Sequence, residues 1–503
     1  MSDVTRQPQS ATHEKCRTPT LHCNAISQWS VRMEATALLL SRIQFAATVS
    51  FHIIFPSFTI GLAAWLAVLE AMSVATGNRV YRRVFAFWLK IFGVAFGMGV
   101  VSGIVMAFQF GTNWSELSRA SGPIQGPLLT YESFTAFALE ATFFGVMMFG
   151  RARVRPWFYL TSCILVAAGT TMSAFWILVN NSWMQHPVGY VVQNGVFVPT
   201  DWAAIIFNHV VWVRFPHMLL GAYLTTAFCV AAVGAAYLLK DRYRIEATVM
   251  VRMSVTLAAV LVPLQILFGH LTGDYLHDDQ PAKFAAVEGR WTDEQPAAEV
   301  IFAIPDAAHE RNRLEWKVPV LGSLVASGTV DSREVGLTDF AAADRPPVLI
   351  PFFAFRVMAG CGLVMLALAW AGTAVARRGK LEQRRWLLWP LALSFPLGFI
   401  AILAGWFTAE VGRQPWTVWG VLRTADALTP GLTAHFAAAT LALFVAIYAF
   451  IFCFGVYYIV RIVQRGLADG NVLTVWNGHV IERTYALAAR PARAPKPNIH
   501  TIR

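Results

Sequence analysis

The sequence predicts an all-α integral membrane protein with nine transmembrane helices. Charged residues are 14% and hydrophobic residues 56% of the 503 positions, whereas soluble domains carry about 25% and about 45–50%. The apolar residues are gathered in long runs, and the connecting loops are alternately rich and poor in Lys and Arg. Helices are expected because a spanning segment must satisfy its own backbone polar groups and no stretch shows sustained strand alternation.

Each apolar run is long enough to cross a hydrocarbon layer of about 30 Å. We expect spans near 43–69, 86–110, 126–150, 157–180, 205–238, 251–272, 351–376, 386–410 and 434–463. Clusters of Arg and Lys follow the odd-numbered spans, whereas the loop 182–203 has none. The positive-inside rule therefore predicts a periplasmic N-terminus and a cytoplasmic C-terminus, which an odd number of spans requires.

Composition divides the chain into five parts. Residues 1–32 form a polar N-terminal extension that lacks the apolar core of a signal peptide. We expect it to be disordered, or to lie upstream of a true start at Met33. The other parts are transmembrane helices 1–6 (33–272), a periplasmic loop (273–350), transmembrane helices 7–9 (351–464) and a cytoplasmic tail (465–503).

The loop 273–350 differs in composition from the rest of the chain. Its 14 acidic and 7 basic residues give a net charge of −7, and loops of this length are usually functional or disordered. Its apolar runs Val300–Ile304 and Trp316–Leu321 are expected to fold locally. The net charge of +11 for the whole chain reflects basic residues between apolar runs, so we do not expect a nucleic-acid partner.

Ionisable residues within an apolar span are costly, and each is therefore a candidate functional residue. They are His52, Glu70, Glu132, Glu140, His217, Arg356 and Glu410. His52 needs a partner for its ring nitrogen, either a haem iron or a hydrogen bond from a neighbouring helix. Glu132 and Glu140 are about 2.2 helical turns apart and so project from nearly one face. This arrangement favours a proton relay, in which one of the two carboxylates could also be an iron ligand. The alternative is that the two carboxylates face a polar cavity or a partner subunit.

Further candidates lie where spans meet the outer side. His217 and Met358 begin the deeper parts of two spans and could hold a low-spin haem iron together. Arg356 beside Met358 requires an anion, such as a haem propionate. Glu410 has Trp406 at i−4 and Arg413 at i+3, so the three share a helix face, and the alternative is an ordinary ion pair at a helix end.

Lys283 and Glu288 lie in the acidic loop, five residues apart. If the segment is helical, they could receive and deprotonate a quinol at the membrane surface. The alternative is a solvated loop helix. The residues alone leave two classes open, a multi-haem redox enzyme fed from the membrane and a proton-coupled transporter.

Several short motifs resemble subunit I of the cytochrome bd quinol oxidases. The strongest are Gln109-Phe-Gly-Thr-Asn-Trp114 and Gly412-Arg-Gln-Pro-Trp416. Others are Ser41-Arg-Ile-Gln-Phe45 with His52, Glu132 through Glu140, Trp176-Ile-Leu-Val-Asn-Asn-Ser-Trp-Met-Gln185, Phe352-Phe-Ala-Phe-Arg-Val-Met358 and Gly405-Trp-Phe-Thr-Ala-Glu410. The resemblance runs from about Met33 to the ninth span.

This resemblance implies an electrogenic, non-pumping enzyme of the bacterial inner membrane. It would oxidise ubiquinol or menaquinol and reduce O2 to water with protons from the cytoplasm. The implied partners are subunit II and, in some complexes, a small single-helix subunit. The implied cofactors are a low-spin haem b, a high-spin haem b, and either haem d or a third haem b.

The resemblance also assigns residues to roles. His217 and Met358 match the ligands of the low-spin haem b, and His52, Glu132 and Glu410 match positions assigned to the two high-spin haems, with the pairing left open. The remaining matches are Arg356 and Arg413 beside the haems, Glu140 and Ser173 on the proton-entry route with Asn181 near it, and Lys283 and Glu288 at the quinol site. The residues expected to be catalytic are Glu132, Glu140, Trp406, Glu410 and Arg413.

The sequence departs from the family pattern in two places. Ala107 stands where many members have Glu, which removes one candidate proton-carrying group. The loop is also short, as in the branch that includes the cyanide-insensitive oxidases. Two alternatives to the oxidase remain. One is the proton-coupled transporter, and the other is a haem scaffold that passes electrons but lacks an O2 site.

Overall fold

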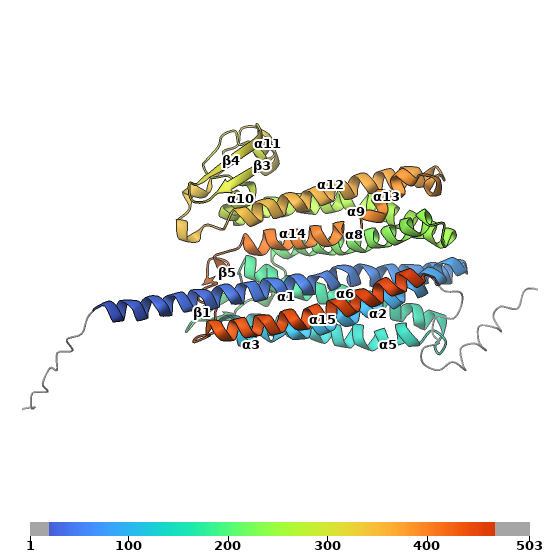
Figure 1. Cartoon of the computed structure of the whole chain (residues 1–503), viewed down its shortest axis with the longest axis horizontal. Coiled ribbons are helices and arrows are strands. Elements are labelled where there is room, and N and C mark those ends of the chain that lie inside the picture. The colour runs from blue at the N-terminus through green and yellow to red at the C-terminus, as the bar shows by residue number, and fades with distance from the viewer. Residues whose placement is uncertain (1–19, 468–503) are drawn as a thin grey trace, which may run out of the picture.

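The computed structural model describes residues 20–467, with side chains from Ala35 onward except those of Ala136 and Phe137. Long helices run side by side along one axis, and the strands gather at one end of the bundle (Figure 1). The opposite end carries the turns that hold the basic clusters, including Arg79–Arg83 and Arg151–Arg155. We call the first the hairpin end and the second the basic end.

The helices have the following bounds. The long helices are α1 (Thr20–Thr76), α2 (Arg79–Ala107), α4 (Ser115–Thr135), α6 (Pro156–Gln185), α8 (His209–Leu239), α9 (Arg244–Asp279), α12 (Leu349–Arg377), α14 (Leu397–Val411) and α15 (Ala434–Arg465). The short helices are α3 (Gln109–Thr112), the π-helix Ala136–Ala141, α5 (Thr142–Phe149), α7 (Trp202–Ile206), α10 (Pro281–Glu288), α11 (Leu321–Ser327) and α13 (Arg385–Leu393). Single turns of 3-10 helix occur at Leu337–Asp339, Ala342–Asp344 and Leu381–Gln383.

Eight helical segments in the described part of the chain are long and apolar enough to cross a membrane. They are Ala35–Thr76, Arg79–Thr112, Ser115–Phe149, Pro156–Gln185, Trp202–Leu239, Arg244–Asp279, Leu349–Arg377 and Ala434–Arg465. A ninth arises if α13 and α14, which bend by 41° at their junction, are counted as one span. The bend lies at Ser394–Pro396, where proline follows a serine whose hydroxyl bonds back to Leu391 O at 2.7 Å.

Part of the N-terminal extension, from Thr20 onward, is helical. Helix α1 begins there and continues without a break past Met33, because the sequence between them holds no proline or glycine to stop a helix. Residues 1–19 of that extension, and 468–503 of the predicted tail, lie outside the described residues.

The fold is mostly helical, but the expectation of an all-α protein is wrong in detail. Three antiparallel hairpins lie between helices: β1–β2, β3–β4 and β5–β6. Their strands are Tyr190–Gln193 with Val196–Pro199, Glu299–Asp306 with Arg311–Val318, and Trp416–Val418 with Leu422–Arg423. The second hairpin contains the whole of the expected run Val300–Ile304 but only the first half of the run Trp316–Leu321, whose last residue begins α11. Its register pairs Phe302 with Trp316.

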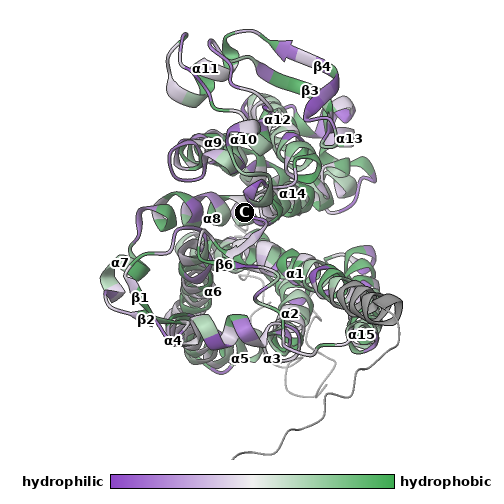
Figure 2. Cartoon of the chain, turned by 90° about the vertical axis from the view of Figure 1, so that its left-hand side faces the viewer, coloured by the Kyte–Doolittle hydropathy of each residue, from purple (hydrophilic) through white to green (hydrophobic). Residues whose placement is uncertain are grey.

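Helix α8 lies between two groups of helices. Viewed from the hairpin end, α9, α12 and α14 lie on one side, and α1, α2, α4, α6 and α15 on the other (Figure 2). The main apolar core joins α1, α2, α8 and α9 towards the basic end through residues such as Leu66, Phe92 and Met250. The part of the bundle nearer the hairpin end is therefore where polar side chains can lie between the helices.

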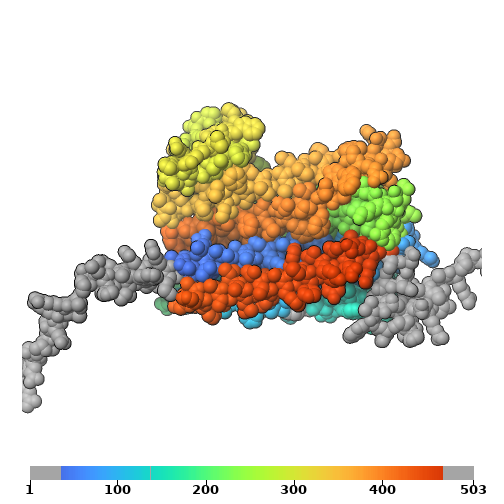
Figure 3. Space-filling model, in the orientation of Figure 1, coloured from blue at the N-terminus to red at the C-terminus, as the bar shows by residue number. Residues whose placement is uncertain are grey.

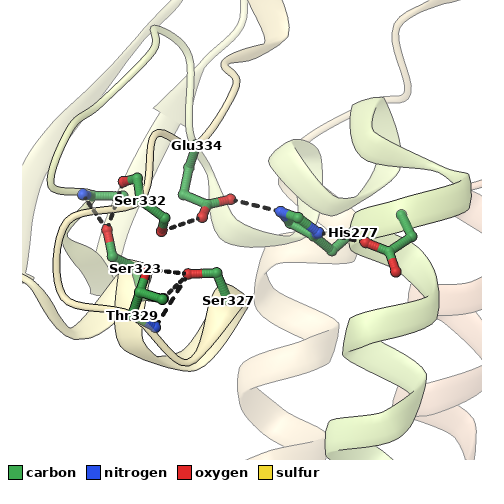
Figure 4. Close-up of polar contacts among 8 residues, drawn as sticks. His277, Ser323, Ser327, Thr329, Ser332 and Glu334 are labelled. Carbon is green, nitrogen blue, oxygen red and sulfur yellow. Dashed lines mark hydrogen bonds and ion pairs between the residues drawn. The ribbon is translucent and has the colours of Figure 1, made fainter.

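The acidic loop is a separate lobe that rests beside α12 (Figure 3). It has its own small core, in which Trp291, Val300 and Leu337 pack with Phe352 of α12. Hydrogen bonds also join the lobe to α9. His277 Nε2 of α9 lies 3.1 Å from Glu334 Oε2, and Ser332 donates to Glu334 Oε1 at 2.8 Å (Figure 4). The loop is thus a folded and docked element.

Candidate functional site

His217 and Met358 belong to one group of four helices. His217 on α8 lies 3.2 Å from Gln265 of α9 through Nε2 and the amide nitrogen. A Cβ at Gly221 would contact both Gln265 and Ile402 of α14. One turn further along α14, a Cβ at Gly405 would lie 2.9 Å from Met358 Sδ. Glycine at 405 therefore leaves the space that the methionine sulfur occupies.

The imidazole of His217 has an unused nitrogen. Its Nδ1 is buried and has no hydrogen-bond partner among the described residues, and neither has Gln265 Oε1. Buried polar atoms are normally paired. The unpaired nitrogen, the glycines at the helix contacts and the thioether of Met358 on α12, a helix that packs against α9 and α14, suit a His/Met ligand set for haem iron.

His52 is held by α2. Its Nδ1 lies 3.0 Å from Ser102 Oγ, and the Ser102 hydroxyl donates to Gly99 O at 3.0 Å. Because that hydroxyl proton is already used, Ser102 Oγ accepts from Nδ1–H, and the lone pair of the ring is on Nε2. This second hydrogen bond is the usual way in which a protein orients a metal-binding imidazole. A Cβ at Gly103 would lie 3.0 Å from the ring.

Glu132 and Glu140 both face α6. Ser173 donates to Glu132 Oε1 at 2.8 Å, and a Cβ at Gly169, one turn away on α6, would lie 2.9 Å from Glu140 Cγ. The shared face is as expected, but the segment between the two acids includes the π-helix. Glu140 is buried, and its Oε1 has no partner within the described chain.

Glu410 lies in a cluster of buried charges at the hairpin end. It forms the expected i,i+3 ion pair with Arg413, and Arg214 Nη2 of α8 lies 4.0 Å from its Oε1. Asn181 and Gln185 of α6 donate to the same oxygen at 3.1 and 3.2 Å. Trp406, on the same helix, is half-buried.

This Glu410 cluster has more positive than negative charge. Three atoms of its arginines, Arg214 Nη1, Arg413 Nε and Arg413 Nη1, are buried without a hydrogen-bond partner among the described residues. Unpaired buried guanidinium donors are costly. They fit a group that carries carboxylates, as haem propionates do, and this supports Arg413 as a residue beside a haem.

Lys283 connects the loop to that cluster. Helix α10 is buried, with Lys283 2% and Glu288 6% exposed, so the alternative of a solvated loop helix is wrong. Lys283 Nζ donates to Gln185 Oε1 at 3.0 Å. Burial holds the pKa of Lys283 well below its usual value, the Arg214 charge lowers this pKa further, and Glu410 opposes both effects. A chain of contacts thus runs from Lys283 through Gln185 to Glu410.

Within the described chain, Arg356 contacts the acidic loop. Its guanidinium donates to the backbone oxygens of Val300 at 3.0 Å and Val287 at 2.9 Å, and lies 4.0 Å from Glu288 and 3.8 Å from Glu299. Two carboxylates of the loop therefore lie near its charge. Arg356 therefore fastens the loop to α12, a role that the sequence alone did not indicate.

Glu299 is a titratable residue that the sequence interpretation missed. Burial and the neighbouring charge of Glu288 raise its pKa to about 8. The folded loop therefore binds a proton more tightly than the unfolded chain, and its stability should fall as pH rises from the ordinary value of 4.5 towards about 8.

Hydrogen exchange tests this pH dependence. From about pH 6 to about pH 8, amide protection in β3 and β4, corrected for intrinsic rates, should fall by at most about tenfold per pH unit. Glu299→Gln should remove most of this slope. Glu310→Gln, at an exposed carboxylate that pairs with Arg345, is the matched control and should retain it. Equal slopes in all three proteins would contradict the role of Glu299.

Together the geometry defines a class of protein: a multi-helix membrane protein with half-buried or buried histidine, methionine and carboxylate side chains suited to haems, joined to a docked loop lobe. Residues 40–467 match the family described as cytochrome bd terminal oxidase subunit I. The chain belongs to this family.

Individual relatives agree with the family match. The cytochrome bd ubiquinol oxidase subunit 1 of Bacillus subtilis (strain 168) is 38% identical over 447 residues, 86% of this chain and 95% of the relative. The cytochrome bd-II ubiquinol oxidase subunit 1 of Escherichia coli (strain K12) is 32% identical over 495 residues, 85% and 96% of the two chains. A solved bd oxidase structure from Geobacillus thermodenitrificans superposes with a TM-score of 0.79 at 28% identity, covering 86% of this chain and 99% of the other.

Proposed function

We propose that this chain is the haem-carrying subunit of a terminal quinol oxidase in the bacterial inner membrane. It oxidises quinol, reduces O2 to water and works with a second subunit. The observation that carries the proposal is the Glu410 cluster, which has unpaired arginine donors and connects through Gln185 to Lys283 of the outer loop. The transporter hypothesis explains neither the unpaired arginine donors nor the match to a family of redox enzymes.

The topology follows from the two ends of the bundle. We place the basic end in the cytoplasm and the hairpin end in the periplasm, with α13 and α14 as one bent span, so that nine spans are present. The loop 273–350 is then the periplasmic quinol loop. This placement puts Lys283, Glu410 and Arg413 on the outer side and leads Glu140 towards the basic end.

The ligand assignment rests on the donor sets. His217 and Met358 would hold a low-spin haem b, and His52, Glu132 and Glu410 would serve the two high-spin haems, one of type b and one of type d or b. When bound, these groups supply one-electron iron chemistry and an open position for O2. Trp406, Arg356 and Arg413 border this region in the proposal.

The protein residues move the protons and hold the quinol. Lys283, with its lowered pKa, can stand as a neutral hydrogen-bond partner for a quinol hydroxyl, while Glu288 accepts the proton that quinol loses. Glu140, Ser173 and Glu132 carry protons from the cytoplasmic side, where Ser173 is already bonded to Glu132. Ubiquinol and menaquinol both offer the required hydroxyl.

A reduced-minus-oxidised spectrum of the purified complex tests the function. Low-spin bands together with a CO-sensitive component, and O2 consumption with quinol, are expected. A protein without haem bands would be a transporter, and low-spin bands with no CO-sensitive component would leave an electron-passing scaffold. A long-wavelength band typical of haem d would decide the type of the third haem.

Lys283→Met is expected to weaken quinol use without changing the haems. Losing a hydrogen bond from a charged or strongly polar partner costs about 1.5–3 kcal/mol, so the KM for quinol should rise by about 10- to 100-fold. Lys317→Met is the control, because Lys317 pairs with Glu294 and Glu315 elsewhere in the same loop. An unchanged KM in Lys283→Met would remove Lys283 from the quinol site.

A further inference from the structure

Two histidines and an aspartate meet where three helices end at the hairpin end of the bundle. His186 caps the C-terminus of α6, His209 begins α8, and Asp279 is the last residue of α9. His186 Nδ1 lies 3.2 Å and His209 Nε2 lies 2.7 Å from the same oxygen, Asp279 Oδ2. One donor atom from each residue lies within 4.8 Å of the other two.

The donor set suits zinc. Zn²⁺ sites with an open position use three protein ligands drawn from His and Asp or Glu, with metal–ligand distances of about 2.0–2.2 Å. Tetrahedral geometry at these distances separates neighbouring ligand atoms by roughly 3.3 Å. The His186–Asp279 and His209–Asp279 separations, 3.2 and 2.7 Å, are close to this value, and the two histidine donor atoms lie within 4.8 Å of each other.

The site is also accessible. The side chain of His209 is 59% exposed, and those of His186 and Asp279 are 30% and 24% exposed. An ion can therefore reach the group from the aqueous phase while two of its ligands remain held by the fold. The ordinary alternative, two imidazoles that simply hydrogen-bond to one carboxylate, involves the same residues and is distinguished by metal binding.

The position of this group connects it to the quinol loop. His186 directly follows Gln185, and Asp279 directly precedes Gln280. The side chain of Gln280 donates to Gln185 O at 2.6 Å, and Gln185 Oε1 accepts from Lys283 at 3.0 Å. An ion bound by His186 and Asp279 would fix the ends of α6 and α9 relative to each other, and with them the Gln185–Lys283 contact.

We propose that His186, His209 and Asp279 form a Zn²⁺ site on the outer side of the protein, and that its occupancy slows quinol oxidation. The inhibitory half of this proposal rests on the proposed function, whereas the binding half does not. The metal acts by holding the end of α6 against the end of α9, and with them the Gln185–Lys283 contact at the proposed quinol site.

Calorimetric titration of the chelator-treated complex with ZnCl2 tests the binding half. The intact protein should show a binding step that His209→Ala and Asp279→Asn weaken by more than about tenfold. X-ray absorption at the zinc edge should show two imidazole ligands in the intact protein and one in His209→Ala. His309→Ala is the matched control, because His309 pairs with Asp306 at 2.9 Å but belongs to no such three-ligand group among the described residues. Equal affinity in all four proteins would overturn the site.

Oxygen consumption over the same ZnCl2 series tests the inhibitory half. The quinol-driven rate of the intact protein should fall with the midpoint of the calorimetric step, and the rate of His209→Ala should not respond in that range. Zinc binding without a change in rate would overturn the inhibitory half alone. A complex that has no haem bands but still binds zinc would overturn the proposed function and leave the metal site standing. Because His209 is largely exposed, its replacement should not disturb folding, and unchanged haem bands will verify this.

Discussion

Met358→Leu should lower quinol-driven O2 consumption by more than about 100-fold, since loss of residues that merely support a metal ligand already costs about 10- to 100-fold. Leucine is close to methionine in volume, and such exchanges usually cost less than about 1.5 kcal/mol. The chain should therefore fold normally. Leucine has no sulfur, however, so the sixth position at the low-spin iron would be empty.

The measurement is the reduced-minus-oxidised spectrum, with O2 uptake recorded on the same preparation. The low-spin bands should be lost or converted to a high-spin form. Met365→Leu is the matched control: Met365 lies two turns further along α12, is 4% exposed and packs with Phe228 and Ala258. A normal low-spin spectrum in Met358→Leu would exclude this methionine as a ligand.

The ligand candidates show what a sequence can predict. A histidine in an apolar helix, such as His52 or His217, is conspicuous because the surrounding residues are apolar. Its hydrogen-bond partners are not conspicuous. Ser102 and Gln265 are polar residues of ordinary kinds, and only the packing of α2 against α1 and of α9 against α8 brings them to the rings.

The helices were predictable because their length and hydropathy are local properties, and their irregularities were not. The bend at Ser394–Pro396 and the π-helix depend on how neighbouring helices accept the interrupted backbone bonds. The hairpin 190–199 lies in a loop that the charge pattern described only as free of Lys and Arg. The family motifs predicted the family, which the match over residues 40–467 confirms, whereas periodicity predicted only helices.

Contacts between distant segments account for the residues that the sequence interpretation missed. The ion pair of Glu410 with Arg413 joins residues only three positions apart in the sequence, and it was expected. Gln185 and Arg214 complete the same cluster, but the Gln185 contact with Glu410 spans 225 residues of sequence. Glu299 was hidden for the same reason, because its burial depends on docking of the loop onto Arg356 of α12.

The Glu410 cluster also gives the largest expected change in stability. Glu410→Gln leaves Arg413 and Arg214 buried without the carboxylate that both approach. Removing one partner of a buried ion pair costs about 3–5 kcal/mol, because the remaining charge is uncompensated. The thermal unfolding midpoint of the solubilised complex should therefore fall clearly, and O2 consumption should fall with it.

Glu382→Gln is the control for this loss. Glu382 forms an ion pair with Arg244 at 2.9 Å, but their side chains are 37% and 59% exposed. Exposed pairs contribute about 0–1 kcal/mol, so the midpoint of this variant should stay near that of the unchanged protein. Similar losses in both variants would indicate that burial of the Glu410 pair has no special effect.

A double variant separates the uncompensated charge from other effects of the substitution. Glu410→Gln combined with Arg413→Met removes both members of the ion pair and leaves groups of similar volume. If the cost of Glu410→Gln arises from the unpaired guanidinium, the double variant should be more stable than the sum of the two single losses predicts, with a coupling of about 0.5–3 kcal/mol. Strictly additive losses would mean that Arg413 is balanced by another anion. A carboxylate-bearing cofactor beside Arg413 would have that effect. The double-mutant cycle should therefore be measured both with and without haem. If a haem propionate is the second anion, the two losses should be additive only in the haem-loaded complex.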